Sequence, residues 1–311
     1  MASLEILTFG EALVEVMRTE VDHPLDTPSL FEGPYPSGAP FIFTVQAARL
    51  GVRAGCIGTV GEDAFGRCLL NQLIQDGVDT RPLRLLHGYT TGVAFVGYKG
   101  DGSREFVFHM RHAAAGQLDA TLADPLLFEG LKVLHIMGSA LAMHADALAL
   151  GHRLLALAAQ FGVPVSFDPN LRRELISLEA AQAAFAPFFD AAQVIFATEE
   201  ELLALTGSAQ AAQGSKRIVV IHQGKDGCTV LEGNTQTQLA AYSVQEVDPT
   251  GAGDCFDAGF LAEWIQGRPA PQAAQFANAC GALAVTVRGP MSGAQSRDVV
   301  EAFMRQHSAL S

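Results

Sequence analysis

The stretch Asp-Pro-Thr-Gly-Ala-Gly-Asp at residues 248–254 combines two features that the transfer of a charged group requires. Gly251 and Gly253, on either side of Ala252, allow a tight turn and leave backbone N–H groups uncovered. An apolar helical pattern follows, so these N–H groups and the helix dipole are expected to face an incoming anion. Asp254 stands directly behind them, where a carboxylate can take a proton from a hydroxyl nucleophile. An anion hole beside a base indicates phosphoryl transfer to an alcohol.

A simpler interpretation of the same motif is a strand-to-helix connection in which Asp254 only caps the helix. Residues 242–247 alternate between apolar and polar side chains and predict a strand, and residues 254–266 predict a helix. Local physical chemistry alone leaves both interpretations open.

Polar residues also follow three other predicted strands. Asp168 comes after the strand expected at 164–167 and suits a magnesium or water-network carboxylate, while Arg172 suits a clamp on an anionic or polyhydroxylated group. The alternative is an Asx turn with a solvated arginine. After the strand at 193–197, Glu199 and Glu200 are typical of charges that complement a helix dipole.

The third strand, at 218–222, ends at His222 and is followed by Gly224, Lys225 and Gly227. Two glycines that bracket a lysine suit the close passage of a nucleotide. A neutral histidine at this place can donate one hydrogen bond, although a histidine at a strand end is often structural.

The elements that must position these residues alternate between strands and alanine-rich helices. This alternation predicts an α/β fold: a three-layer α/β/α core with a mostly parallel central sheet, whose ligands bind at the carboxyl ends of the strands. Further strands are expected at 4–9, 54–61, 132–137 and 229–231. Helices are expected at 41–50, 64–75, 144–160, 178–190, 199–206, 270–288 and 296–307.

The segment from residue 91 to residue 110 interrupts this alternation. Residues 93–98 and 104–109 predict two strands of a hairpin, joined by a glycine-rich turn. With residues 12–36, which are extended and then rich in Pro, Asp and Ser, the segment 89–112 predicts a small β lid inserted in one domain that spans residues 1–311. An unpaired edge along 93–98 would favour a homodimer through the lids.

Composition narrows the possible functions. The formal net charge of −13 argues against binding nucleic acid or an anionic membrane through bulk electrostatics. Five scattered cysteines without a Cys-x-x-Cys pair indicate reduced thiols. The N-terminus carries no basic leader, and no apolar run reaches membrane-spanning length, so we expect a cytoplasmic protein. No P-loop, His-Glu-x-x-His or Gly-x-Ser-x-Gly motif occurs.

The motif at 248–254, late in a chain of this length, resembles the signature of the ribokinase-like (PfkB) carbohydrate kinases. An N-terminal stretch at 33–51, with Ser37-Gly38-Ala39 at its centre, resembles the other signature of this family. The resemblance covers residues 10–290. It implies a ribokinase-like fold and ATP-dependent phosphorylation of a primary sugar hydroxyl with Mg2+, and relatives also show a monovalent-cation site such as K+ near Asp248 and Thr250.

The resemblance also implies roles for individual residues. Asp254 is the base, and the N–H groups of Gly251, Ala252 and Gly253 form the anion hole. Residues assigned to the nucleotide are Thr198, His222, Gly224, Lys225, Gly227 and Asn278. Residues assigned to the sugar are Gly38, Ala39, Arg104, Arg111, Asp168, Arg172 and Asp254. Glu201 and Asp168 are the candidate metal ligands.

Three positions depart from the family pattern. Ile42 stands where a sugar-binding asparagine is usual, so we expect a remodelled substrate pocket. Thr198 replaces an asparagine in the motif that Glu201 completes, and His222 replaces a threonine or lysine.

The motifs are most similar to those of tagatose and fructose kinases, which predicts a ketohexose acceptor. The alternative is a 2-keto-3-deoxygluconate kinase, whose acid substrate would need a cation such as Arg111 or Arg172. An alternative of another class is an inactive sugar- or nucleotide-binding module. The retained Asp254 argues against it, because a mere binder gains nothing from a carboxylate that faces phosphate.

Overall fold

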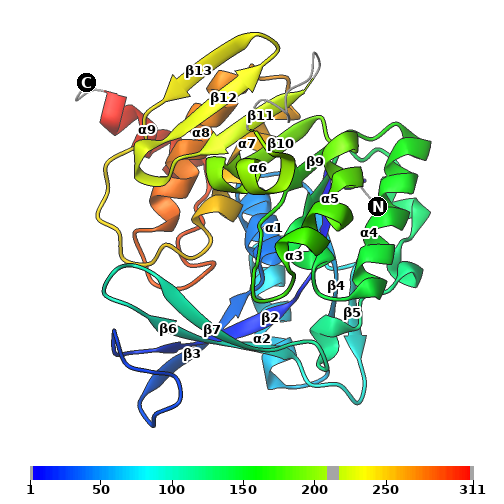
Figure 1. Cartoon of the computed structure of the whole chain (residues 1–311), viewed down its shortest axis with the longest axis vertical. Coiled ribbons are helices and arrows are strands. Elements are labelled where there is room, and N and C mark those ends of the chain that lie inside the picture. The colour runs from blue at the N-terminus through cyan, green and yellow to red at the C-terminus, as the bar shows by residue number, and fades with distance from the viewer. Residues whose placement is uncertain (1–2, 209–216, 309–311) are drawn as a thin grey trace.

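A central sheet of nine strands and a separate sheet of four strands organise the part of the chain that our computed structural model describes, residues 3–208 and 217–308 (Figure 1). The order in the central sheet is β13-β12-β11-β10-β9-β8-β1-β4-β5. Its strands are β1 Ile6–Phe9, β4 Ala54–Gly61, β5 Leu83–Leu86, β8 Val133–Met137, β9 Val165–Asp168, β10 Val194–Thr198, β11 Ile218–His222, β12 Cys228–Glu232 and β13 Thr235–Leu239.

Along the central sheet from β11 through β10, β9, β8, β1 and β4 to β5, each strand is parallel to its neighbour. Strands β12 and β13 are antiparallel and form one edge of the sheet. Strands β1 and β8 are buried along their whole length, as expected of parallel strands covered on both faces. The helices are α1 Ala39–Arg49, α2 Ala64–Gln75, α3 Gly138–Leu141, α4 Ala145–Phe161, α5 Leu178–Ala191, α6 Glu199–Thr206, α7 Ala252–Trp264, α8 Ala270–Ala284 and α9 Arg297–Ser308.

Two apolar cores, one on each face of the central sheet, define the layers. On one face, Leu154 of α4 and Phe188 of α5 pack in one cluster with Phe167 of β9. On the other face, Phe43 of α1 and Phe260 of α7 pack with strand residues and α8. The chain therefore has the predicted three-layer arrangement of a ribokinase-like fold. None of the helices within 3–208 and 217–308 is long and apolar enough to cross a membrane.

The small sheet has the order β3-β2-β6-β7 and lies below the carboxyl ends of the central strands in the view of Figure 1. Its strands are β2 Leu13–Arg18, β3 Phe31–Ser37, β6 Gly92–Tyr98 and β7 Arg104–His109. The hairpin of β6 and β7 is confirmed, but β6 also pairs in parallel with β2. The expectation of an unpaired edge at 93–98 is therefore wrong, and the edges belong to β3 and β7.

Two local predictions are wrong. Residues 242–247 do not form a strand, because this extended segment finds no partner strand and instead runs beside α8, where Val247 N donates to Val285 O. Residues 31–37, expected to be loop, form the edge strand β3. Its two prolines are tolerated because an edge strand need not donate on its outer side. Strands β5 and β13 were not predicted.

Candidate active site

The N-terminus of α7 is shaped by Gly251, which has a left-handed φ of 80° and precedes the first helical residue. A side chain at this position would collide with its surroundings, because a Cβ would stand 2.8 Å from the Pro290 carbonyl oxygen and 2.9 Å from Ile42. No side chain caps the helix. Ala252 N makes only a long hydrogen bond of 3.4 Å, to Pro249 O, so the start of the helix remains open to a ligand, and Asp254 does not act as the cap of α7.

Asp254 is buried, with 7% of its surface exposed, and no described group donates a hydrogen bond to its side chain. It lines a cavity of about 80 Å³. Burial raises the pKa of Asp254 to about 7, which Arg172 and Arg104 oppose while Glu11 and Glu15 add to it. A carboxylate that has a pKa near neutrality and accepts no hydrogen bond from the described part of the protein fits a general base.

The cavity in front of Asp254 lies between the central core and the small sheet. Arg104, Phe106 and Phe108 alternate along β7 and therefore face the same side of the sheet, toward this cavity. We refer to it as the substrate cavity. Its lining residues are Glu11, Leu13, Glu15, Ser37, Gly38, Ala39, Ile42, Arg104, Phe106, Phe108, Met110, Ser139, Arg172, Glu174, Leu175, Thr250, Gly251 and Asp254.

Three acidic residues of the substrate cavity, Glu11, Glu15 and Glu174, were not predicted, and the first two are buried. Glu15 Oε1 accepts a 2.6 Å hydrogen bond from Ser37, and Glu11 Oε1 accepts one of 3.2 Å from Ser139. The second carboxylate oxygen of each is buried without a partner among the described residues. Burial raises the pKa of Glu15 to about 7 and that of Glu11 above its usual value. The sequence held one signal: two glutamates four residues apart in an otherwise apolar stretch.

A second cavity of about 600 Å³ lies on the other side of the α7 N-terminus. The sequence-predicted residues that meet here are His222, Gly224, Lys225, Gly227, Ala252, Gly253 and Asn278. The remaining lining residues are Asp226, Ala241, Tyr242, Ser243, Val244, Glu246, Pro249, Phe256, Gly281, Ala282 and Val285. Its volume suits a ligand of nucleotide size. We refer to it as the nucleotide cavity.

Four predicted site residues do not line either cavity. Thr198 and Glu201 instead form a capping box at the start of α6, in which Glu201 also accepts a 2.9 Å hydrogen bond from Leu171 N. Asp168 is buried and accepts a hydrogen bond from Asn170 N, as in the Asx-turn interpretation. Arg111 is exposed, because the register of the hairpin directs Arg104 inward and leaves Arg111 beyond the strand end.

The metal prediction can be tested against these contacts. Both oxygens of Glu201 already accept hydrogen bonds, from Leu171 N and from Thr198. Across residues 3–208 and 217–308, no three acidic, histidine or cysteine side chains gather into a metal site. The residues therefore fit a magnesium ion that is held mainly by nucleotide phosphates and water, as is usual for Mg2+.

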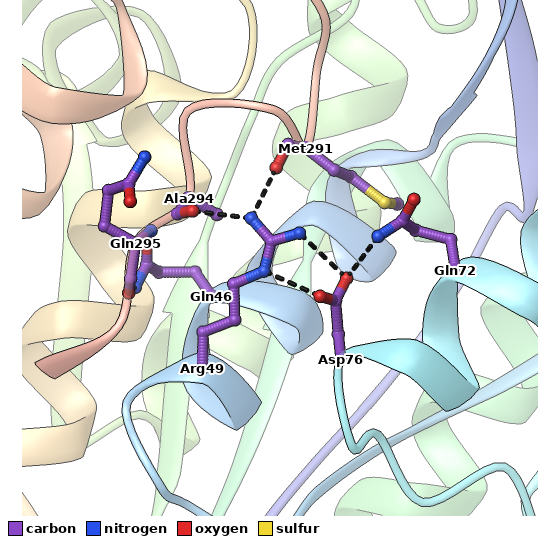
Figure 2. Close-up of polar contacts among 7 residues, drawn as sticks. All are labelled: Gln46, Arg49, Gln72, Asp76, Met291, Ala294 and Gln295. Carbon is purple, nitrogen blue, oxygen red and sulfur yellow. Dashed lines mark hydrogen bonds and ion pairs between the residues drawn. The ribbon is translucent and has the colours of Figure 1, made fainter.

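A polar network around Arg49 holds the loop at residues 291–295 (Figure 2). Pro290, which precedes this loop, lies close to Gly251. The Arg49 guanidinium makes two hydrogen bonds to Asp76, of 2.8 and 3.0 Å, and also donates to the carbonyls of Met291 and Ala294. Gln72 donates to Asp76 from α2. Helices α1 and α2 are thus tied to the loop that follows Pro290.

Asp248, at the start of the motif, is fully buried and accepts three hydrogen bonds. Thr250 N donates to Oδ1, while Gly289 N and the Tyr98 hydroxyl donate to Oδ2. The side chain of Thr250 accepts a 2.7 Å hydrogen bond from Arg104. Two residues of the small sheet therefore contact the motif directly.

Comparison with known proteins gives a consistent result. The profile of the pfkB family carbohydrate kinases matches residues 4–297. A curated relative, probable fructokinase-7 of Arabidopsis thaliana, is 32% identical over 95% of this chain and 91% of its own length.

Solved structures with a similar fold include proteins with bound nucleotide. A protein of E. coli that is provisionally named ribokinase II, in complex with ATP and Mg2+, is 37% identical, with a TM-score of 0.91 over 98% of this chain and all of its own. A fructokinase of Vibrio cholerae O395, in complex with fructose, ADP and calcium, is 30% identical, with a TM-score of 0.83 over 97% of this chain and 99% of its own.

Proposed function

The chain belongs to the pfkB family of carbohydrate kinases, and on this premise we propose that it transfers the γ-phosphoryl group of ATP to a primary hydroxyl of a ketohexose. It is a phosphotransferase that acts on a sugar hydroxyl. The acceptor of the tagatose or fructose type, and the roles of individual residues, are the parts that we propose.

The observation that carries the proposal is the position of the α7 N-terminus between the two cavities. Asp254 faces the substrate cavity, and the next residue toward the N-terminus, Gly253, faces the nucleotide cavity. ATP, when bound, supplies the phosphoryl group. Asp254 then takes the proton of the attacking hydroxyl, and the N–H groups of Gly251, Ala252 and Gly253 stabilise the negative charge at the junction.

The substrate cavity favours a neutral polyol. The unpartnered oxygens of Glu11 and Glu15 are buried acceptors, and a buried acceptor without a donor is unfavourable. Sugar hydroxyls supply the missing donors, whereas a carboxylate substrate would be repelled by both groups. Ile42 contributes apolar surface in place of an amide. A neutral ketohexose meets these requirements.

A 2-keto-3-deoxygluconate kinase is the second candidate, and one observation favours it. Arg172 lines the substrate cavity, and its guanidinium makes no hydrogen bond or ion pair with the part of the chain described here. An arginine in this position can bind a substrate carboxylate in a bidentate manner. Replacement of Arg172 by glutamine would abolish activity on the acid but only weaken activity on a neutral ketose.

We further propose that the small sheet acts as a lid within a single domain of residues 1–311, formed by about 12–36 and 89–112. Arg104, Phe106 and Phe108 would close over the sugar and exclude water from the reaction, limiting the hydrolysis of ATP. A homodimer through this sheet would use the free edges of β3 or β7. Analytical ultracentrifugation tests it, and a monomer at micromolar concentration would contradict it.

For the ions, we propose that Mg2+ is required and that K+ has little effect. Asp248 already accepts three hydrogen bonds, so its carboxylate has little capacity left for a monovalent cation. The Arg104 guanidinium at Thr250 also places a positive charge where the cation would bind.

The test is an assay of ADP release with Mg-ATP and a panel of acceptors: tagatose, fructose, sorbose, ribose, 2-keto-3-deoxygluconate and a nucleoside. Turnover of a neutral ketose supports the proposal. Turnover of 2-keto-3-deoxygluconate alone supports the kinase activity but contradicts the proposed ketohexose substrate. No turnover despite measurable ATP binding supports an inactive binding module instead.

A further inference from the structure

His222 places one ring nitrogen beside the anion hole. The residue ends β11 and lines the nucleotide cavity, with 19% of its side chain exposed. A Cβ built on Gly253 would stand 3.9 Å from His222 Nδ1, so Nδ1 is the ring nitrogen on the side of the α7 N-terminus. Phosphates at that N-terminus would lie within reach of Nδ1.

The other ring nitrogen faces a buried carboxylate. His222 Nε2 lies 3.1 Å from Asp257 Oδ1, and Asp257 is fully buried one helical turn after Asp254. The contact has an ion-pair distance without hydrogen-bond alignment, since His222 Nε2 and both oxygens of Asp257 have no hydrogen bond among the residues of 3–208 and 217–308. Burial of a carboxylate without a hydrogen bond lowers the stability of the fold. A function of Asp257 that offsets this loss must therefore involve the neighbouring imidazole.

A second histidine extends this arrangement into the core. His135 Nε2 lies 4.0 Å from Asp257 Oδ2, and His135 Nδ1 lies 2.8 Å from the Ser166 hydroxyl. The His135 ring stacks on Phe43 with a centroid distance of 4.2 Å. The 4.0 Å separation of His135 from Asp257 is too long for a hydrogen bond, so His135 is a polar neighbour of Asp257 and not a bonded partner. Ser166, His135, Asp257 and His222 nevertheless form a buried chain of polar side chains from β9 and β8, through α7, to the nucleotide cavity.

Aromatic side chains hold the outer end of this chain in place. The Phe256 ring contacts His222 edge-on at a centroid distance of 4.6 Å, and Phe196 lies at 6.0 Å. The imidazole thus has apolar contacts on its sides, Asp257 at one nitrogen and the cavity at the other.

We propose that Asp257, supported by His135, holds the His222 ring so that Nδ1–H donates a hydrogen bond to a phosphate oxygen of the bound nucleotide. The inference rests on the proposed kinase function and adds Asp257 and His135 as positioning residues. His222 is the residue that touches the nucleotide. Asp257 acts through it.

The placement of protons supports this role. If Asp257 carries a proton and the ring turns so that the Asp257 O–H donates to Nε2, the imidazole proton must be on Nδ1. If Asp257 is ionised, the pair is a carboxylate and an imidazolium, and Nδ1 again carries a proton. Nδ1 is therefore a donor in both of these forms, in each of which the pair holds two protons.

The surrounding charges act on this pair in opposite directions. Burial lowers the pKa of His222, whereas the carboxylates of Asp168, Glu201 and Asp254 raise it. Lys225 also lines the cavity and lies on the nucleotide side. A phosphate at Nδ1 adds a further negative charge beside the ring and favours the form that donates.

The inference is tested by calorimetric titration of the whole protein with ADP and with adenosine, which lacks phosphates. Asp257→Leu keeps about the size of the side chain and removes both its donor and its acceptors. We expect it to weaken ADP binding about tenfold or more, the effect of losing a charge-assisted hydrogen bond at Nδ1. Adenosine binding should not change. His222→Gln should act in the same way, and His135→Gln more weakly.

The double variant of Asp257→Leu and His222→Gln shows whether Asp257 acts through His222 or independently of it. If Asp257 acts through His222, the double variant binds ADP no more weakly than His222→Gln alone. The exposed His152, on α4, gives the control His152→Gln, which should bind ADP like the wild type. Melting temperatures show that each variant is folded.

Four results would overturn the inference. Unchanged ADP affinity in Asp257→Leu, with ADP bound normally by the wild type, overturns it alone. Additive losses of ADP affinity in the double variant would show that Asp257 does not act through His222. Equal losses of affinity for ADP and adenosine would show that Asp257 has only a structural role. Failure of the wild type to bind ADP overturns the proposed function as well.

Discussion

Gly253 and Asp254 are consecutive residues of α7, yet they line different cavities. The first turn of the helix separates the space of about 600 Å³ from the space of about 80 Å³, so two ligands can meet only across these residues. A side chain at Gly253 would approach His222, whereas the Asp254 carboxylate turns to Arg104 and Arg172. The motif therefore joins two half-sites rather than belonging to either.

Asp254→Asn should lower kcat by about a thousandfold while ADP affinity stays within a factor of two, because the amide cannot accept the hydroxyl proton. The checks are the ADP-release assay and calorimetric titration. Asp146→Asn, in the exposed first turn of α4, is the matched control and should have wild-type kcat. Unchanged turnover in Asp254→Asn would remove its assignment as the base.

The pH dependence follows from the raised pKa of Asp254, about 7. The base must be deprotonated, so kcat/KM for the sugar should rise with pH and level off above about 7. Glu15, whose pKa is also raised to about 7, titrates in the same range. Measurement from pH 5 to pH 9 checks this, and a profile that is flat between pH 6 and pH 8 would contradict it.

The same shift has a consequence for stability, with the opposite sign to an ordinary salt-bridged aspartate. The folded state holds the Asp254 proton more tightly than the unfolded state, so the free energy of unfolding decreases as pH rises from about 4 to about 7. Asp254→Asn removes this decrease in the free energy of unfolding, because the amide does not titrate. The variant should therefore melt a few degrees above the wild type at pH 8 and show no such gain at pH 4, by scanning calorimetry.

Arg104→Ala should raise the KM for the sugar about tenfold or more, since Arg104 lines the substrate cavity and binds Thr250. Arg111→Ala is a nearby control, because Arg111 is exposed and lies outside the cavity. Steady-state kinetics with both variants separates them. Equal effects would mean that the lid reaches the sugar in another register than the one described.

Arg49→Met should lower the free energy of unfolding by about 2 kcal/mol, since it leaves Asp76 with Gln72 as its remaining donor and leaves two loop carbonyls without theirs. It should also lower kcat, because the loop follows Pro290, which lies close to Gly251. Arg305→Ala breaks an exposed pair with Glu301 and should cost less than about 0.5 kcal/mol. Urea denaturation compares the two variants. Equal decreases in the free energy of unfolding would show that the Arg49 network stabilises the fold no more than an exposed ion pair does.

Activity should change less than about twofold when KCl is replaced by tetramethylammonium chloride at constant ionic strength, because Asp248 is already bonded by three donors. The ADP-release assay at saturating Mg-ATP measures this directly. A large activation by K+ would show that Tyr98 or Gly289 yields its place on Asp248 to the cation.

The sequence predicted where α7 begins because the signals are local: a left-handed turn at Gly251 and an apolar helical pattern after it. The roles of Asp254 as the base and of residues 251–253 as the anion hole stay predictions. The alternation of strands and helices likewise predicted the central sheet, since buried parallel strands and alanine-rich helices have distinct patterns.

The rest depended on tertiary packing. The burial of Glu11 and Glu15 follows from how residues 11–18 pack between β3 and β6 and share a cavity with residues of β7 and α7, which no local pattern reveals. Residues 242–247 alternate like a strand, but a strand needs a neighbour, and the sheet ends at β13. Whether Arg104 or Arg111 faces the sugar depends on hairpin register, and one residue of register reverses the side of a strand.

The parallel pairing of β2 with β6 joins segments about eighty positions apart, from Leu13 with Gly92 to Met17 with Val96. The centre of the small sheet therefore has a high contact order, although each of its outer strands is a local neighbour. Strands β4 and β5 and helix α2 lie between the two segments in the chain, so closing this loop is favourable only after they have folded. The lid is accordingly expected to fold last and to open first, with amide hydrogen exchange faster than that of the central sheet.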